Sequence, residues 1–178
     1  MSDIQNAFRL IGSLDLTSLS HDDTEEKIAA LCAKAVTPYG TTAAVCVYPE
    51  WVPLARKLLK KTPVKVATVV NFPAGGNDFK LMKDEIKKGL SGGADEIDAV
   101  FPYRDFLAGN TDSCRRFLDI IQRECGKHTS KIILETGELN HVSTIAAAVK
   151  LCLEYDIDFI KTSTGKTPVS ATVGAANI

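Results

Sequence analysis

A lysine and two carboxylates lie inside apolar segments whose alternating side chains are typical of β-strands. In the segment IDFIKT, the two-residue alternation places Phe159, Lys161 and Ser163 on one face. Asp98 lies within EIDAVF, and Glu135 ends KIILE. Because a buried ion costs several kcal/mol unless it is paired, these charges require an explanation.

A lysine in a desolvated pocket is a nucleophile for carbonyl groups. Burial disfavours the ammonium form and can bring a lysine pKa from about 10.4 toward about 7–8, which leaves a neutral amine that forms Schiff bases. Schiff-base formation and enamine protonation move protons, so a carboxylate is needed nearby, and Asp98 is the candidate. From these residues alone, a snorkelling lysine and structural carboxylates stay open as the alternative.

The composition predicts one soluble domain over residues 1–178. The chain is 45% hydrophobic and 24% charged, and its net charge of −1 predicts neither a nucleic-acid partner nor an anionic membrane partner. No signal sequence or 18-residue apolar run occurs, so we expect a cytoplasmic protein. The five cysteines form no C-x-x-C pair, which argues against disulfides and a zinc site; we expect most of them to be buried small hydrophobic residues.

The period of the apolar residues switches several times between two and 3.6, which indicates alternating strands and helices and therefore the α/β class. Stripes of apolar residues predict helices between the strands, and Ser20 and Asp23 are spaced like a capping box before the first of these helices. The chain ends at Ile178 in what resembles the first turns of a further helix. The predicted strands are Leu14–Leu16, Thr42–Tyr48, Val64–Val70, Glu96–Phe101, Lys131–Glu135 and Ile157–Thr162.

This alternation leaves two architectures open, an open doubly wound sheet and a closed eight-stranded barrel. The segment after the first strand has no glycine, and no G-x-G-x-x-G or P-loop motif occurs, which favours the barrel. The carboxyl ends of barrel strands meet at one mouth. In a barrel, Lys161, Asp98, Glu135 and Cys46 would therefore meet there.

Six segments resemble the strand motifs of deoxyribose-phosphate aldolases, in the order of that family. The segment DFIKTSTGK resembles the Schiff-base strand, and it is the most specific match. The other five are LDLTSL, TAAVCVYP, VNFPAG, GADEIDAVFPYR and ILETGEL. The resemblance extends from about residue 10 to the end of the chain.

The resemblance implies a (β/α)8 barrel of the TIM type and a cofactor-independent lyase, with no metal. The implied reaction is the reversible cleavage of 2-deoxy-D-ribose 5-phosphate to D-glyceraldehyde 3-phosphate and acetaldehyde, in deoxyribonucleotide catabolism. The matching positions are Lys161 for the Schiff-base lysine, Asp98 for the proton relay, Lys166 at the phosphate end, Cys46 in the pocket wall, and Asp15 and Thr17 beside the substrate hydroxyls.

The chain departs from this pattern at its C-terminal end, because a barrel of this kind has eight strands in about 250 residues and six are predicted here. The family's last two strands carry a second lysine and the loops that hold most of the phosphate. We expect a polypeptide that ends at Ile178 to have little activity and to associate, with a second copy or a missing C-terminal segment as its protein partner. The alternatives are an inactive remnant that binds phosphosugar weakly or acts as an interaction module, and another phosphosugar barrel enzyme.

Overall fold

The computed structural model describes residues 3–178. Their backbone contacts divide them into two compact units, which comprise residues 3–69 with 88–96 and residues 70–87 with 97–178. Each unit is described by itself. The single domain expected from the sequence stays a prediction.

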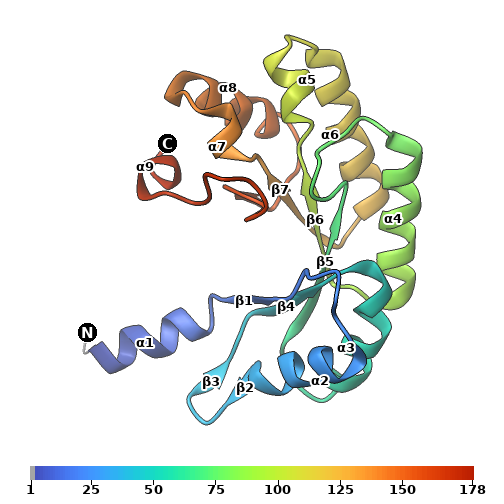
Figure 1. The fold of residues 1–178 in the computed structure, drawn as a ribbon, viewed down its shortest axis with the longest axis vertical. Coiled ribbons are helices and arrows are strands. Elements are labelled where there is room, and N and C mark those ends of the chain that lie inside the picture. Colours follow the sequence, from blue (N-terminus) through green and yellow to red (C-terminus); the bar gives the residue numbers. More distant parts are fainter. Residues whose placement is uncertain (1–2) are drawn as a thin grey trace. The chain divides into compact units, whose positions relative to one another are not determined.

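The main sheet has six strands, one for each predicted strand. Their order follows the chain, β1-β4-β5 in the first unit and β6-β7-β8 in the second. The pairs β1/β4, β4/β5 and β7/β8 are parallel, and helices connect successive strands (Figure 1). The α/β class and the succession of β/α units are therefore confirmed. The strands are β1 (Asp15–Thr17), β4 (Ala44–Val47), β5 (Lys65–Val70), β6 (Glu96–Val100), β7 (Thr129–Ile133) and β8 (Phe159–Lys161).

The first unit is built around β4, every residue of which is buried. The register pairs Thr17 of β1 with Cys46 of β4, and Cys46 with Ala67 of β5. The helices α2 and α3 pack against each other (Figure 1) and bury Ile28 and Ala55. The remaining elements of this unit are α1 (Asp3–Ile11), α2 (Glu25–Lys34), β2 (Val36–Thr37), β3 (Gly40–Thr41), η1 (Pro49–Trp51) and α3 (Val52–Leu59).

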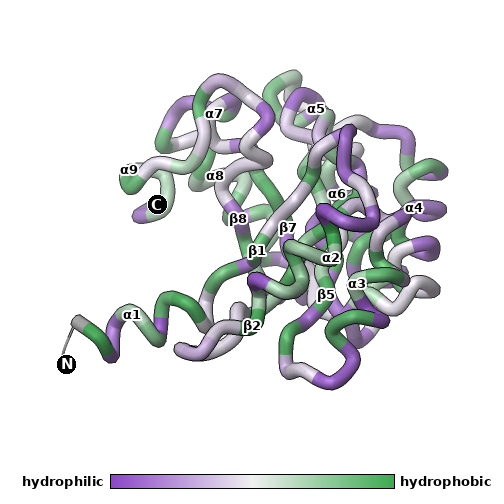
Figure 2. The backbone as a smooth tube through the Cα atoms, turned by 60° about the horizontal axis from the view of Figure 1, so that its bottom comes forward, coloured by the Kyte–Doolittle hydropathy of each residue, from purple (hydrophilic) through white to green (hydrophobic). Residues whose placement is uncertain are grey.

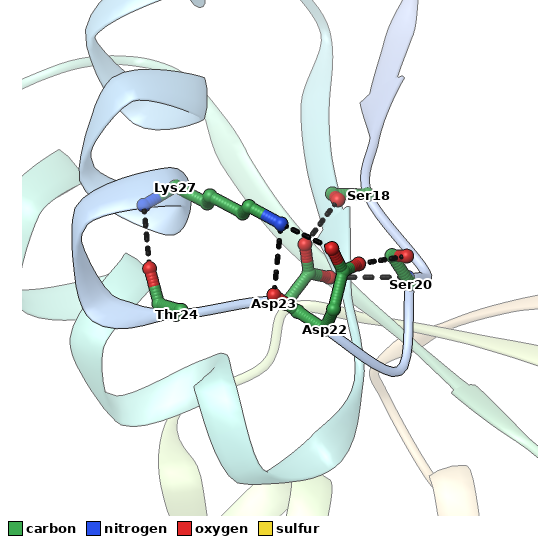
Figure 3. A network of polar contacts seen from close by, with 6 residues as sticks. All are labelled: Ser18, Ser20, Asp22, Asp23, Thr24 and Lys27. Atoms are coloured by element: carbon green, nitrogen blue, oxygen red, sulfur yellow. Dashed lines mark hydrogen bonds and ion pairs between the residues drawn. The ribbon is translucent and has the colours of Figure 1, made fainter.

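The N-terminus of α2 differs from the predicted capping box. Thr24 is the N-cap, and its side chain accepts a hydrogen bond from the Lys27 backbone N–H at 3.3 Å. Asp23 does reach back to the Ser20 N–H at 3.2 Å, but it does so in the turn before the helix, where it also accepts from the Ser18 hydroxyl at 2.7 Å (Figure 3). The predicted helix start was therefore wrong by four residues, because the same spacing also closes a turn.

An ion pair completes this polar network. Lys27 Nζ lies 2.5 Å from the exposed Asp22 carboxylate and donates to the Asp22 carbonyl at 2.9 Å (Figure 3). The hydrogen bond from Lys27, followed by that from the Ser20 hydroxyl, lowers the pKa of Asp22 to about 2. Asp22 therefore stays ionised at neutral pH and pairs with Lys27 between the loop after β1 and the first turn of α2.

The second unit has a core formed by helix stripes on the strands β6 and β7. In α4, Phe79, Met82 and Ile86 are buried, while the polar positions alternate with them along the helix (Figure 2). In α6, Phe117 and Ile121 are fully buried. The helices of this unit are α4 (Phe79–Gly92, which continues into the first unit), α5 (Tyr103–Leu107), α6 (Thr111–Cys125), α7 (Thr136–Leu139), α8 (Val142–Cys152) and α9 (Val173–Ala176). The last of these confirms the helix expected at the C-terminal end.

The turn after β5 is organised by one side chain. Asn71 has a left-handed backbone (φ 55°), and its side chain bonds both the N–H and the carbonyl of Gly76, at 3.1 and 2.9 Å. It also donates to the carbonyl of Val100 at 2.9 Å, at the end of β6. Within this turn Gly75 (φ 59°) passes so close to the end of β6 that an added Cβ would clash with the Phe101 carbonyl oxygen.

Gly75→Ala should therefore destabilise the protein more than a matched substitution at Gly109, which is also left-handed (φ 79°) but has open space where a Cβ would stand. Both variants carry the left-handed cost of about 1–2 kcal/mol, and overpacking should add about 1–3 kcal/mol to Gly75→Ala alone. Urea unfolding measures both losses. Equal losses would show that β6 yields to the added methyl group.

Candidate active site

Two lysines contact one buried carboxylate in the second unit. Asp98 of β6 has a side chain that is 1% exposed, and Lys161 Nζ of β8 forms an ion pair with its Oδ2. Lys131 Nζ of β7 lies 3.6 Å from its Oδ1. The Lys131 side chain is 6% exposed and that of Lys161 is 31% exposed. One lysine is therefore enclosed, and the other is open to a ligand.

The strand register explains why these charges meet. Lys131 pairs with Phe159, and Ile133 pairs with Lys161, so Lys131 and Lys161 lie on the same face of neighbouring strands. Lys131 also lies over the Phe159 ring, 6.0 Å from its centroid. In the sheet, β7 lies between β6 and β8. Asp98 of β6 therefore reaches the amines of both Lys131 and Lys161. The predicted meeting of Lys161 and Asp98 is observed.

Glu135 holds the segment that follows Lys161. It has a left-handed backbone (φ 56°), which ends β7 two residues earlier than predicted. Its fully buried carboxylate accepts hydrogen bonds from the Thr164 hydroxyl and, at 3.3 Å, from the Thr164 backbone N–H. Thr164 Oγ1 in turn accepts from the Lys166 N–H at 3.0 Å. This geometry supports the structural interpretation of Glu135, and it fixes the course of the chain from Lys161 to Lys166.

The remaining predicted residues lie in the first unit, Asp15 and Thr17 at the two ends of β1 and Cys46 near the carboxyl end of β4. Thr17 pairs with Cys46, and Asp15 pairs with Ala44. Residues in register on parallel strands share a face, so Asp15, Thr17 and Cys46 face the same side. The Thr17 hydroxyl bonds the Asp15 carbonyl at 3.0 Å, and Cys46 is 1% exposed. Their convergence with Lys161 and Asp98 stays a prediction.

The cysteines behave as the sequence suggests. All five are free and buried. Burial raises the pKa of Cys114 to about 11, and those of Cys125 and Cys152 to about 12. These three thiols therefore stay protonated at neutral pH, as expected of small hydrophobic residues.

Residues 3–178 include no group of three or more His, Cys, Asp or Glu side chains arranged to hold a metal ion. No helix in this range is long and apolar enough to span a bilayer.

Lys131 is the site residue that the sequence reasoning missed. It is the first residue of the predicted strand Lys131–Glu135, where a lysine usually extends into water, but it is the middle residue of β7. Its spacing was informative, however, because Lys131, Ile133 and Glu135 share a face of one predicted strand. A lysine on that face, next to a strand with a buried aspartate, is a candidate ion-pair partner.

Comparison with known proteins gives a consistent result. A model described as DeoC/LacD family aldolase matches residues 9–178. A protein designated a deoxyribose-phosphate aldolase from Coccidioides immitis is 30% identical, with a TM-score of 0.89 over 94% of this chain and 65% of its own. An aldolase named QR15 is 31% identical, with a TM-score of 0.86 over 98% of this chain and 74% of its own.

A deoxyribose phosphate aldolase from Aeropyrum pernix, described as a tetramer, is 27% identical, with a TM-score of 0.78 over 89% of this chain and 66% of its own. The chain thus spans less than two thirds of the length of the Coccidioides and Aeropyrum proteins. With the six strands of the sheet, these likenesses confirm the expected incomplete barrel, with about six of eight strands.

A double-mutant cycle should measure the enclosed ion pair. Lys131→Met keeps a long unbranched side chain but removes the charge beside Asp98, so it should lower the free energy of unfolding. In an Asp98→Asn background the same change should cost about 0.5–3 kcal/mol less, as expected for side chains in contact. Urea unfolding gives each value, and Lys150→Met on the exposed face of α8 is the control. Additive losses would contradict the pairing.

Proposed function

Because the chain belongs to the DeoC/LacD family of aldolases, we propose that it carries the catalytic site of an aldolase that works through a lysine Schiff base. The substrate is 2-deoxy-D-ribose 5-phosphate, which is cleaved reversibly to D-glyceraldehyde 3-phosphate and acetaldehyde. The observation that carries this proposal is the buried Asp98 between an enclosed Lys131 and a more open Lys161.

Lys161 is the proposed nucleophile because it is the accessible member of the cluster. Asp98 can neutralise only one of the two neighbouring ammonium groups, and in a site of low dielectric the two repel each other. Loss of a proton from Lys161 relieves this repulsion and leaves an amine that attacks a carbonyl carbon. Lys131 thereby supplies a positive charge of the kind that we expected only from strands beyond Ile178.

Asp98 is the proposed proton carrier. The Lys161 amine adds to C1 of the open-chain sugar, and the resulting carbinolamine loses water to give the imine. The C3 hydroxyl then gives up its proton as the C2–C3 bond breaks, which releases glyceraldehyde 3-phosphate and leaves an enamine. Protonation of the enamine at C2 and addition of water release acetaldehyde. Asp98, which contacts the reacting amine, accepts and returns these protons.

The other residues are assigned to substrate binding. Lys166 lies five residues after Lys161 in a segment held by Glu135, and it is proposed to meet the phosphate as a point charge. Asp15 and Thr17 are proposed to bond substrate hydroxyls, and Cys46 to line the pocket. None of these roles requires a metal or a cofactor.

The alternative function is phosphosugar binding without turnover, or a role as an interaction module. The two functions differ in one observable property, since only the aldolase forms a covalent imine.

Borohydride trapping tests the proposal directly. When the chain is mixed with acetaldehyde or deoxyribose 5-phosphate and reduced, Lys161 should gain a stable adduct, because the imine becomes a secondary amine. Peptide mapping should place the adduct within DFIKTSTGK, and Lys161→Ala should abolish it. An adduct on Lys166 that persists in Lys161→Ala would refute the assignment, and no adduct at all would favour the binding function.

Asp98→Asn should reduce turnover by roughly two to four orders of magnitude, because it keeps the shape of the side chain but removes the proton acceptor. Retro-aldol cleavage coupled to detection of glyceraldehyde 3-phosphate gives the rate, and circular dichroism shows whether the fold is kept. Normal turnover in a folded variant would mean that Asp98 has a structural role only.

A further inference from the structure

Ser163 has a hydroxyl group that the fold leaves without a partner. Its Oγ atom is buried and makes no hydrogen bond in the structure. Ser163 as a whole is half-buried. The exposed part of the residue is therefore made up of atoms other than the hydroxyl oxygen.

The neighbouring polar groups of the segment, unlike the Ser163 hydroxyl, have hydrogen-bond partners. The Thr164 hydroxyl is bonded to Glu135, and the carbonyl of Thr162 accepts a hydrogen bond from the Thr136 N–H at 2.8 Å. A buried hydroxyl without a hydrogen bond is destabilising, and alanine would remove this cost without leaving a large cavity. A serine at this position is thus unfavourable for the free protein.

The position of Ser163 suggests what the hydroxyl binds. It follows Lys161, the last residue of β8, by two residues, and Lys166 lies three residues further along. It therefore lies between the residue that bonds the carbonyl carbon and the residue at the phosphate end. Rotation about χ1 between staggered positions moves a serine oxygen by about 2 Å, which can bring it to the exposed side of the residue.

We propose that Ser163 is a substrate-positioning residue whose hydroxyl turns out of its buried position and hydrogen-bonds a hydroxyl group of the bound sugar. This inference rests on the proposed Schiff-base function. The ligand oxygen comes from the carbohydrate chain rather than from the phosphate, because Ser163 precedes Lys166 and lies nearer to Lys161 along the chain. The missing partner in the free protein is thereby supplied by the substrate.

The test compares Ser163→Ala with the unmodified chain by stability and by trapping. The urea midpoint of Ser163→Ala should rise, because the unsatisfied hydroxyl is gone. The sugar concentration that gives half-maximal borohydride trapping should rise about tenfold, the effect of one lost hydrogen bond. This shift should be equal for deoxyribose 5-phosphate and for 2-deoxyribose, with the maximal trapping rate changed less than twofold. Ser170→Ala, at an exposed serine of the same segment, should change neither property.

Acetaldehyde provides the internal control, because it forms the same imine but has no hydroxyl group. Its half-maximal concentration should be the same for Ser163→Ala and the unmodified chain. An equal shift with acetaldehyde would overturn the proposal, since Ser163 would then act on Lys161 and not on the sugar. A shift confined to deoxyribose 5-phosphate would overturn it in favour of a phosphate contact, and a lower urea midpoint would show that the hydroxyl has a partner in the free protein.

Failure of the proposed function gives a different result. If the unmodified chain is not trapped by any of the three compounds, there is no imine at Lys161, and both proposals fail. If the unmodified chain is trapped and Ser163→Ala behaves identically, only the role of Ser163 fails.

Discussion

The pairing of the buried Asp98 carboxylate with two lysines is the interaction on which the proposed chemistry of the second unit depends. Asp98, Lys131 and Lys161 come from the neighbouring strands β6, β7 and β8. The cluster forms only when all three strands keep their register. A shift of one residue in β8 would turn Lys161 to the other face of the sheet and leave Asp98 with one fewer partner. The cluster is therefore a constraint on the fold as well as a potential source of reactivity.

Three of the loops that follow strands are each held by a polar side chain that bonds main-chain groups. Asn71 holds the turn after β5, Glu135 holds the segment after β8, and Asp23 holds the loop after β1. Two of these anchors, Asn71 and Glu135, have left-handed backbones. Such anchors keep a loop in one conformation without large apolar contacts.

The local pattern of apolar residues was sufficient to predict the six strands and the long helices. Buried strands appear as short apolar segments, and a helix that buries one stripe repeats its apolar residues with a period of 3.6. The pattern failed where a single backbone conformation ended an element. The predicted strand Lys131–Glu135 lies two residues too late, since the left-handed Glu135 follows the true end at Ile133. The helix α1 and the hairpin β2–β3 were not predicted, because they are short and bury little.

The sequence predicted those residues of the candidate site that are charged but stand inside apolar strands. A lysine and an aspartate inside apolar strands stood out, and the structure pairs them. Lys131 did not stand out, because a lysine at the first position of a predicted strand usually extends into water. Ser163 was expected on the strand face of Lys161, but it lies beyond the end of β8 at Lys161. The lack of a partner for its hydroxyl is a property of packing that no local pattern records.

The buried thiols of α6 and α8 have a consequence for how the protein can be studied. With pKa values of about 11 to 12, Cys114, Cys125 and Cys152 are almost entirely in the unreactive thiol form at neutral pH, and they are shielded from solvent. An alkylating reagent can reach them only when these helices separate from the sheet. The rate at which they are labelled therefore reports how often the second unit opens, without any introduced probe.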